Sequence, residues 1–156
     1  MGNAQLTFYL SEGVLTGYVA GKWINIYALS GGGGGTKKKS GPDEPGTVNN
    51  PYRTGQRERG SVRGGPLPAG RYEIGTPIAW HHGRAARLTP SVSADKFTNI
   101  TGRDGGFLIH GRGPKGSDGC IVPKYPADFQ ELMDGLANDK GGVLFVLEGE
   151  GGVRFA

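Results

Sequence analysis

The chain has 156 residues and a formal net charge of +4; 31 residues are glycine, 10 are proline and only 35% are hydrophobic. This composition favours one domain of short strands joined by tight turns over long helices or two full domains. The single cysteine excludes an internal disulfide and a zinc ribbon. No window of about 20 apolar residues exists and the N-terminus lacks a positive leader, so we expect neither stable membrane insertion nor a signal peptide.

Three segments near the N-terminus are predicted to be consecutive hairpin strands, at residues 5–10, 14–19 and 22–29. They are rich in β-branched and aromatic residues, and short Gly-containing turns separate them. In the third segment the odd-numbered residues from Trp23 to Leu29 lie on one face and the even-numbered residues on the other. We expect both faces to be at least partly buried.

Residues 31–64 break this pattern with five consecutive glycines, three lysines and many polar turn residues. The segment is too long for an ordinary connection and lacks the Gly-Lys-Ser/Thr of a phosphate-binding loop, so we predict a flexible Gly/Lys-rich loop, either disordered or acting as a lid. Residues 31–65 hold seven basic and three acidic side chains, which account for the whole net charge. A basic loop can attract nucleic acid, an anionic membrane or an anionic wall polymer. Only Tyr52 is there to stack on bases, so we expect no nucleic-acid partner.

Regular structure is predicted to resume after the turn at residues 65–70, with short strands at 71–74, 77–80, 86–89 and 107–110 and a final buried strand at 142–147. One helix is predicted at residues 126–138, because its apolar residues follow helical spacing and Pro126 suits the first turn. Lys140 and Gly141 suit its end. The expected fold class is therefore mainly β with one helix (α+β).

The only cysteine, Cys120, lies ten residues after His110 in a glycine-rich stretch. A thiolate is the nucleophilic form of cysteine, and a neighbouring imidazole can take the thiol proton. Gly111 lets the chain turn sharply and lets a substrate approach the backbone. In the turn that ends with Gly119 and Cys120, consecutive backbone N–H groups could hold a developing oxyanion. We interpret Cys120 as the attacking group of an acyl-transfer enzyme.

The cysteine, the other histidines and two aromatic residues also have less reactive interpretations. A single cysteine is often a small buried apolar residue. His81 and His82 are adjacent, so on a strand they would face opposite ways, and no companion cluster accompanies them; we expect neither a metal nor a cofactor. Tyr72 and Trp80 could line a groove or pack in the core. A papain-like amidase fits poorly, because in that family the cysteine precedes the histidine.

Two motifs carry a resemblance to a known family. His110-Gly111, a spacer, and Ser117-Asp118-Gly119-Cys120 are similar to the active-site signature of the L,D-transpeptidase catalytic domain, the YkuD family, which reads His-Gly, a spacer, then Ser/Thr-x-Gly-Cys. The segment ending in Ser30-Gly31, together with the Gly-Pro-Leu-Pro-Ala-Gly-Arg-Tyr-Glu-Ile stretch at residues 65–74, resembles the family's Ser-Thr-Gly followed by Thr-Pro-x-Gly-x-Phe-x-Ile. The resemblance implies a single catalytic domain over residues 1–156 with a YkuD-like β-sandwich or mixed sheet.

The resemblance also implies a reaction and a role for each matching residue. The substrate would be a peptidoglycan stem peptide, cleaved between the L-centre of its third, diamino-acid residue and the following D-alanine. Cys120 would attack the carbonyl and form a thioester, while His110 would take the thiol proton and give it to the leaving amine. The Gly111 carbonyl would orient the imidazole and Ser117 would brace the turn. The N–H groups of Asp118, Gly119 and Cys120 would form the oxyanion site.

Three departures from the family pattern concern the substrate side. The spacer between His110 and Ser117 is six residues, shorter than usual, which suggests a more open site. Asp118 replaces a common His, and Val122 stands where many members have Arg or Asn. We therefore assign the substrate carboxylate to Arg112, with Lys115 second, because an Arg fork can hold a carboxylate through two hydrogen bonds. Tyr72 is a further substrate-binding candidate.

The form of the turn at residues 65–72, the small size and the absence of an export signal resemble the Tlde1-type branch, which includes antibacterial effectors delivered by type VI secretion. That placement implies synthesis in the cytoplasm, delivery by a specialised system to the periplasm of a target bacterium, and an immunity protein as a partner. Hydrolysis, crosslinking and D-amino-acid exchange all remain open. The competing hypothesis is a non-catalytic wall-binding module on the same fold.

Overall fold

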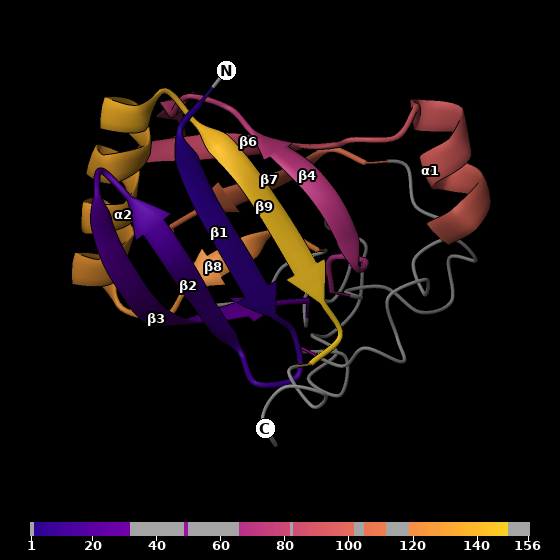
Figure 1. The fold of residues 1–156 in the computed structure, drawn as a ribbon, viewed down its shortest axis with the longest axis horizontal. Coiled ribbons are helices and arrows are strands. Elements are labelled where there is room, and N and C mark those ends of the chain that lie inside the picture. Colours follow the sequence, from indigo (N-terminus) through magenta and orange to yellow (C-terminus); the bar gives the residue numbers. More distant parts are fainter. Residues whose placement is uncertain are drawn as a thin grey trace.

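The computed structural model describes residues 2–31, 49, 66–81, 83–101, 105–111 and 119–149. Within them, nine strands form one sheet and two helices flank it (Figure 1). The strands are β1 (Ala4–Tyr9), β2 (Val14–Val19), β3 (Lys22–Ser30), β4 (Gly70–Ile74), β5 (Ile78–Trp80), β6 (Gly83–Pro90), β7 (Phe107–His110), β8 (Ile121–Pro123) and β9 (Gly142–Leu147). The helices are α1 (Ala94–Thr101) and α2 (Pro126–Asp139). The mainly β class is confirmed, with a second helix in addition to the one predicted.

The sheet closes on itself into a barrel-like arrangement. The strand order is β4-β9-β1-β2-β3-β8-β7-β6-β5, and β4 also pairs with β6, which joins the two sides and leaves β5 outside the ring. Most neighbours are antiparallel, but β1 pairs with β9 in parallel and so does β7 with β8. Closure removes most free edges from the sheet and encloses the core between its walls.

The predicted N-terminal strands are confirmed within one or two residues, but one expectation about them is wrong. Along β3 the even-numbered residues turn inward and end at Ala28 and Ser30, both fully buried. The odd-numbered residues face outward, and Trp23 and Tyr27 remain 59% and 58% exposed. Neither helix packs over this side among the described residues, so only the inner face of β3 is buried.

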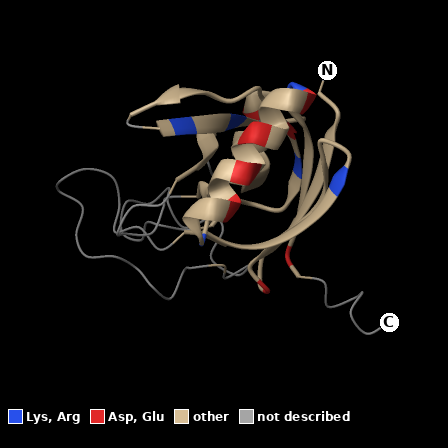
Figure 2. Ribbon diagram, turned by 90° about the vertical axis from the view of Figure 1, so that its left-hand side faces the viewer, with Lys and Arg blue, Asp and Glu red and all other residues tan. Residues whose placement is uncertain are grey.

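Helix α2 lies along one side of the barrel, and α1 lies on the far side (Figure 1). The apolar residues of α2 are buried: Phe129, Leu132, Met133 and Leu136. A row of acidic residues on α2 faces outward (Figure 2). Pro126 occupies the first turn and Lys140 caps the end of the helix, as the sequence predicts. The left-handed conformation of Lys140 was not predicted. Contacts to β1, β2, β6 and β8 tie α2 to strands from both walls.

Helix α1 is absent from the sequence prediction. Ser93 begins it by accepting a hydrogen bond from the N–H of Lys96 at 3.2 Å, and Phe97 is its one buried residue. The helix has only eight residues, which is shorter than the window over which helical periodicity can be read from a sequence. Strand β8 was missed as well, because its three residues are defined by pairing with β3, far away in the sequence, and with β7. No helix in the described part of the chain is long and apolar enough to cross a membrane.

Candidate active site

The register of β7 and β8 brings the two proposed reactive residues to one face of the sheet. Ile109 pairs with Ile121 in parallel, and both are fully buried. Because side chains alternate along a strand, His110 and Cys120 lie on the opposite, outer face. The N–H of Leu108 donates to Cys120 Sγ at 3.3 Å, which places the sulfur beside β7. Strand spacing puts the Cα atoms of His110 and Cys120 roughly 8 Å apart, within reach of an imidazole side chain.

The imidazole of His110 is oriented by its own backbone neighbour. Its Nδ1 lies 2.7 Å from the carbonyl oxygen of Gly111. A carbonyl can only accept, so Nδ1 carries the hydrogen and, in the neutral ring, Nε2 is left as the proton acceptor. This tautomer is the one that a general base for a thiol requires.

Trp80 stacks on the same imidazole, and this contact was not foreseen from the sequence. The two ring centroids are 4.5 Å apart and the planes are tilted by 32°. Burial lowers the pKa of His110, the hydrogen bond to Gly111 opposes that effect, and the charge of His81 adds to the lowering. The ring therefore stays neutral, and able to accept a proton, at a lower pH than an exposed histidine would.

Ser30 braces the turn that precedes Cys120. Its fully buried hydroxyl donates to the carbonyl oxygen of Gly119 at 3.0 Å and accepts from the N–H of Leu67 at 2.9 Å. Gly119 has φ of 115°, a conformation that other residues adopt only with strain. Ser30 thus links β3, the segment before β4 and the turn at the cysteine. The sequence pointed to Ser30 only through the motif segment that ends in Ser30-Gly31.

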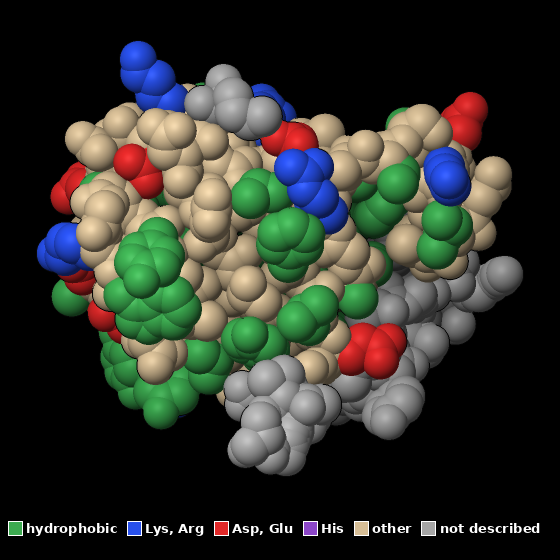
Figure 3. Space-filling view, viewed as in Figure 1, with side chains coloured by type: hydrophobic (Ala, Val, Ile, Leu, Met, Phe, Trp, Pro, Cys, Tyr) green, Lys and Arg blue, Asp and Glu red, His purple; other side chains and the backbone are tan. Residues whose placement is uncertain are grey.

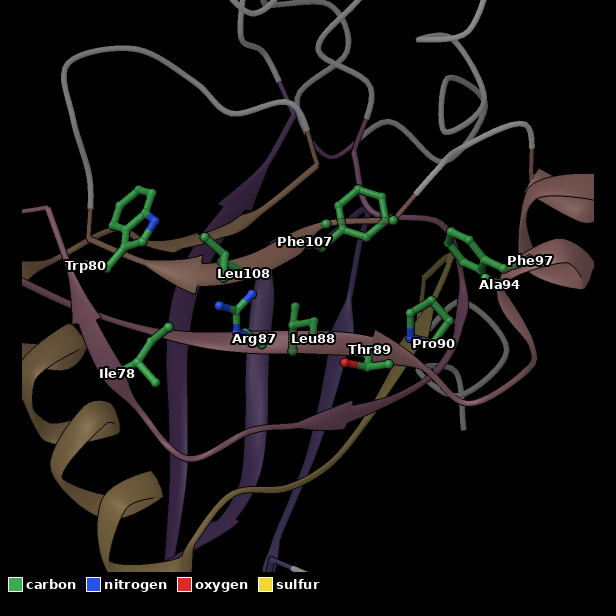
Figure 4. A pocket seen from close by; sticks show the side chains of 12 residues that line it. Ile78, Trp80, Arg87, Leu88, Thr89, Pro90, Ala94, Phe97, Phe107 and Leu108 are labelled. Atoms are coloured by element: carbon green, nitrogen blue, oxygen red, sulfur yellow. The ribbon is translucent and has the colours of Figure 1, made fainter.

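Two cavities share Trp80 as a lining residue. One, of about 460 Å³, is bounded by Gly111 and the start of α2. The other, of about 360 Å³, lies over β6 and β7 and is lined by Leu108, whose N–H contacts Cys120 (Figure 4). Cys120 is not among the lining residues of either cavity, but its side chain is only partly buried. At least part of the Cys120 residue is therefore exposed to solvent.

The predicted site residues have different outcomes. His110, Gly111, Gly119 and Cys120 lie together at the ends of β7 and β8. Four further candidates lie outside the described residues: Arg112, Lys115, Ser117 and Asp118.

The expectation that Tyr72 binds substrate is wrong. Its side chain is only 1% exposed, and it packs against Phe97 and Phe107. Its hydroxyl donates to the carbonyl oxygen of Pro68 at 2.6 Å. Tyr72 points into the barrel because alternation along β4 turns it inward, so it offers no surface to a substrate.

Only one residue of the histidine pair is described by the structure. His81 lies in the turn after β5, with its ring 4.3 Å from that of Trp80, and His82 is outside the described residues. In the part of the chain that the structure describes, no three His, Cys, Asp or Glu side chains form a group that could hold a metal ion.

Comparisons with known proteins identify the fold. No protein-family model matches the chain, and no curated protein sequence matches it. Among solved structures, an L,D-transpeptidase from Xylanimonas cellulosilytica DSM 15894 is similar, with a TM-score of 0.50 and 16% sequence identity. The match covers 94% of this chain and 61% of that one. At this identity the likeness concerns architecture: the chain has the fold of an L,D-transpeptidase domain.

Proposed function

We propose that this protein is a cysteine acyl-transfer enzyme that acts on peptidoglycan stem peptides. It cleaves between the L-centre of the third, diamino-acid residue and the D-alanine that follows. The observation that carries the proposal is the shared outer face of His110 and Cys120, with Nε2 of the imidazole left to accept a proton. The fold of an L,D-transpeptidase domain and the His-Gly and Ser-x-Gly-Cys motifs support the reaction class.

The first step forms a thioester. His110 Nε2 takes the thiol proton as Cys120 Sγ attacks the carbonyl carbon of the diamino acid. The negative charge that develops on the carbonyl oxygen is held by backbone N–H groups at the turn ending in Gly119 and Cys120. When the C–N bond to D-alanine breaks, the imidazolium returns its proton to the leaving amine. The products are the acylated cysteine and free D-alanine.

The second step regenerates the cysteine. His110 takes a proton from the incoming nucleophile, which attacks the thioester carbon, and the sulfur leaves as the thiol once that proton is returned. Water as the nucleophile gives L,D-carboxypeptidase activity. The amine of a D-amino acid gives exchange, and the side-chain amine of a second stem gives a crosslink.

Mass spectrometry of purified muropeptides tests this proposal and separates the three products in one experiment. The wild-type protein is expected to convert tetrapeptide stems to tripeptides, exchanged stems or crosslinked dimers, while Cys120→Ala leaves them unchanged with its fold intact. Equal conversion by Cys120→Ala would overturn the mechanism. Binding to sacculi without any product, together with no acylation of Cys120 by a carbapenem-like probe, would favour a non-catalytic wall-binding module instead.

The setting that we propose for this activity is an antibacterial effector, delivered by a specialised secretion system and acting in the periplasm of a target cell. The support is the resemblance of the turn at residues 65–72 to the Tlde1-type branch. An immunity protein would be its natural partner. Expression with and without an added export signal tests this: toxicity should require both export and Cys120. Equal harmlessness in both compartments would remove the effector role while leaving the enzyme intact.

A further inference from the structure

Two arginines on β6 have contrasting surroundings. Arg84 is committed to α2: its guanidinium lies 2.9 Å from Asp134 Oδ1 and 2.9 Å from Gln130 Oε1. Arg87, three residues along the strand, is exposed, and its guanidinium has no ion-pair or hydrogen-bond partner among the described residues. A cation without a counter-ion beside a candidate active site is available for an anionic ligand.

The position of Arg87 relates it directly to the nucleophile. Arg87 pairs with Leu108 across β6 and β7, and the Leu108 N–H contacts Cys120 Sγ. The three residues therefore form a row across the outer face of the sheet. Two strand spacings put the Cα atoms of Arg87 and Cys120 roughly 10 Å apart. An arginine can bridge most of that distance toward a substrate attached to the sulfur.

The cavity around Arg87 has the character of a subsite for a short chain that ends in an anion. Its volume is about 360 Å³, and the apolar side chains of Ile78, Trp80 and Leu108 line it together with Thr89. Figure 4 shows Arg87 rising from β6 toward Leu108, between these apolar groups. Methylene groups suit such walls, and an arginine fork suits a carboxylate through two parallel hydrogen bonds.

A second row on the outer face of the sheet contains His110 and Ala85, next to the row of Arg87, Leu108 and Cys120. These two rows separate the position of the leaving group from that of the acyl group. The amine that leaves must lie beside His110, which pairs with Ala85, two residues from Arg87 on β6. The row that contains Arg87 and Cys120 is therefore on the side of the acyl group that stays on the sulfur.

We propose that the 360 Å³ cavity binds the side chain of the acyl-donating diamino acid, and that Arg87 selects donors whose side chain carries a carboxylate. This inference rests on the proposed function. Arg87 on β6 would determine which donor side chain is accepted, on the acyl side of the scissile bond. The amidated donor presents the same methylene chain and lysine presents a similar one, but neither offers an anion to the guanidinium.

The kinetic test compares three tetrapeptide stems, whose third residue is meso-diaminopimelate, its side-chain amide, or lysine. The wild-type protein is expected to favour the free carboxylate by about 10- to 100-fold in kcat/KM, the range of a charge-assisted pair. Arg87→Gln should process all three at similar rates, and Arg87→Lys should recover part of the preference. Arg84→Gln, which removes a charge from the same strand, should keep the full preference. Discrimination that survives Arg87→Gln, or is lost equally in Arg84→Gln, would overturn the proposal.

A binding measurement makes the test independent of turnover. On the Cys120→Ala background, calorimetric titration should give at least a 10-fold weaker Kd for the amidated stem than for the free stem, and Arg87→Gln should abolish the difference. Equal affinity of the Cys120→Ala protein for both stems would overturn the role of Arg87. A protein that discriminates in binding yet never cleaves any stem would contradict the acyl-transfer proposal and leave the carboxylate subsite standing.

Discussion

The outer surface of the sheet has two contrasting regions. Over β2 and β3 it carries large aromatic side chains, and Tyr18, Trp23 and Tyr27 are all more than half exposed (Figure 3). Over β7 and the start of β8 it carries His110 and Cys120, which are only partly buried and each held by a hydrogen bond. Both regions lie on one continuous sheet, so the difference comes from the surroundings of the side chains.

Orientation distinguishes the candidate site from the aromatic region. Tyr18 and Trp23 meet edge to face at 4.9 Å, but solvent surrounds much of both rings. His110 is held from two directions, by the Gly111 carbonyl and by the Trp80 ring. An imidazole held in one orientation presents its Nε2 to a nearby proton without first having to reorient in water. Exposure of apolar area alone gives no such effect.

The largest effect is expected from a substitution in the region of His110 and Cys120. His110→Gln removes the proton acceptor, and we expect kcat to fall by about 10²- to 10⁴-fold. Because the thiol then ionises only through bulk pH, the residual rate should increase as pH is raised. Stopped assays of D-alanine release across pH give both results, and a thermal melt checks that the fold is retained. A His110→Gln protein with the wild-type rate would show that the imidazole is not the base.

Removal of the Ser30 hydroxyl should affect both activity and stability. Ser30→Ala leaves the buried Gly119 carbonyl and Leu67 N–H unsatisfied, which costs about 1–3 kcal/mol of unfolding free energy. Loosening of the turn should also lower kcat about 10-fold, because a donor of an oxyanion site acts only when held in place. Denaturant unfolding and steady-state kinetics measure the two effects. Ser11→Ala, at an exposed hydroxyl, is the matched control and should change neither.

The pH dependence of kcat/KM tests the environment of His110. Burial lowers the pKa of His110, so the acid limb of the profile should have its midpoint below the ordinary value of 6.5. Trp80→Leu should hydrate the imidazole and raise its pKa. As the pH is lowered, this variant should therefore lose activity at a higher pH than the wild type does. An acid limb that stays in place, or moves to lower pH, would contradict the role of the Trp80 ring.

A smaller effect is expected in the core below the site. Tyr72→Phe removes the hydrogen bond to Pro68 and should lower the unfolding free energy by about 1 kcal/mol or somewhat more. Because Tyr72 is buried, KM for stem peptides should not change. An increase in KM without a loss of stability would restore the original expectation that this residue binds substrate.

The smallest effect is expected in the aromatic region. Trp23→Ala removes an exposed ring whose edge contact with Tyr18 is worth about 0.5–1.5 kcal/mol at most. Turnover of stem peptides should equal that of the wild type. A large loss of activity in this variant would mean that the aromatic region takes part in substrate binding, and the contrast between the two regions would no longer hold.

Local patterns in the sequence were sufficient for much of the fold. The N-terminal strands and α2 were predictable because alternation and helical spacing are properties of neighbouring residues. Strand β8 and the buried hydrogen bonds of Ser30 were not, because they depend on segments far apart in the chain.

For the candidate site the sequence predicts a chemistry, which stays a prediction, and it anticipates the geometry only in part. The motif around Cys120 predicts that Cys120 is the nucleophile and His110 the base. The stacking of Trp80 on His110 joins residues 30 positions apart, and it follows from the register of β5, β6 and β7. The inward orientation of Tyr72 likewise depends on how β4 closes the barrel.

The central claim is that the sulfur of Cys120 becomes acylated by a stem peptide. Brief incubation of the protein with a tetrapeptide stem, an acid quench and mass spectrometry of the Cys120-containing peptide test it directly. The account predicts a mass increase equal to the stem minus its terminal D-alanine, located on Cys120 and absent from Cys120→Ala. Release of D-alanine at an undiminished rate by Cys120→Ala, with no adduct on the wild-type cysteine, would contradict it.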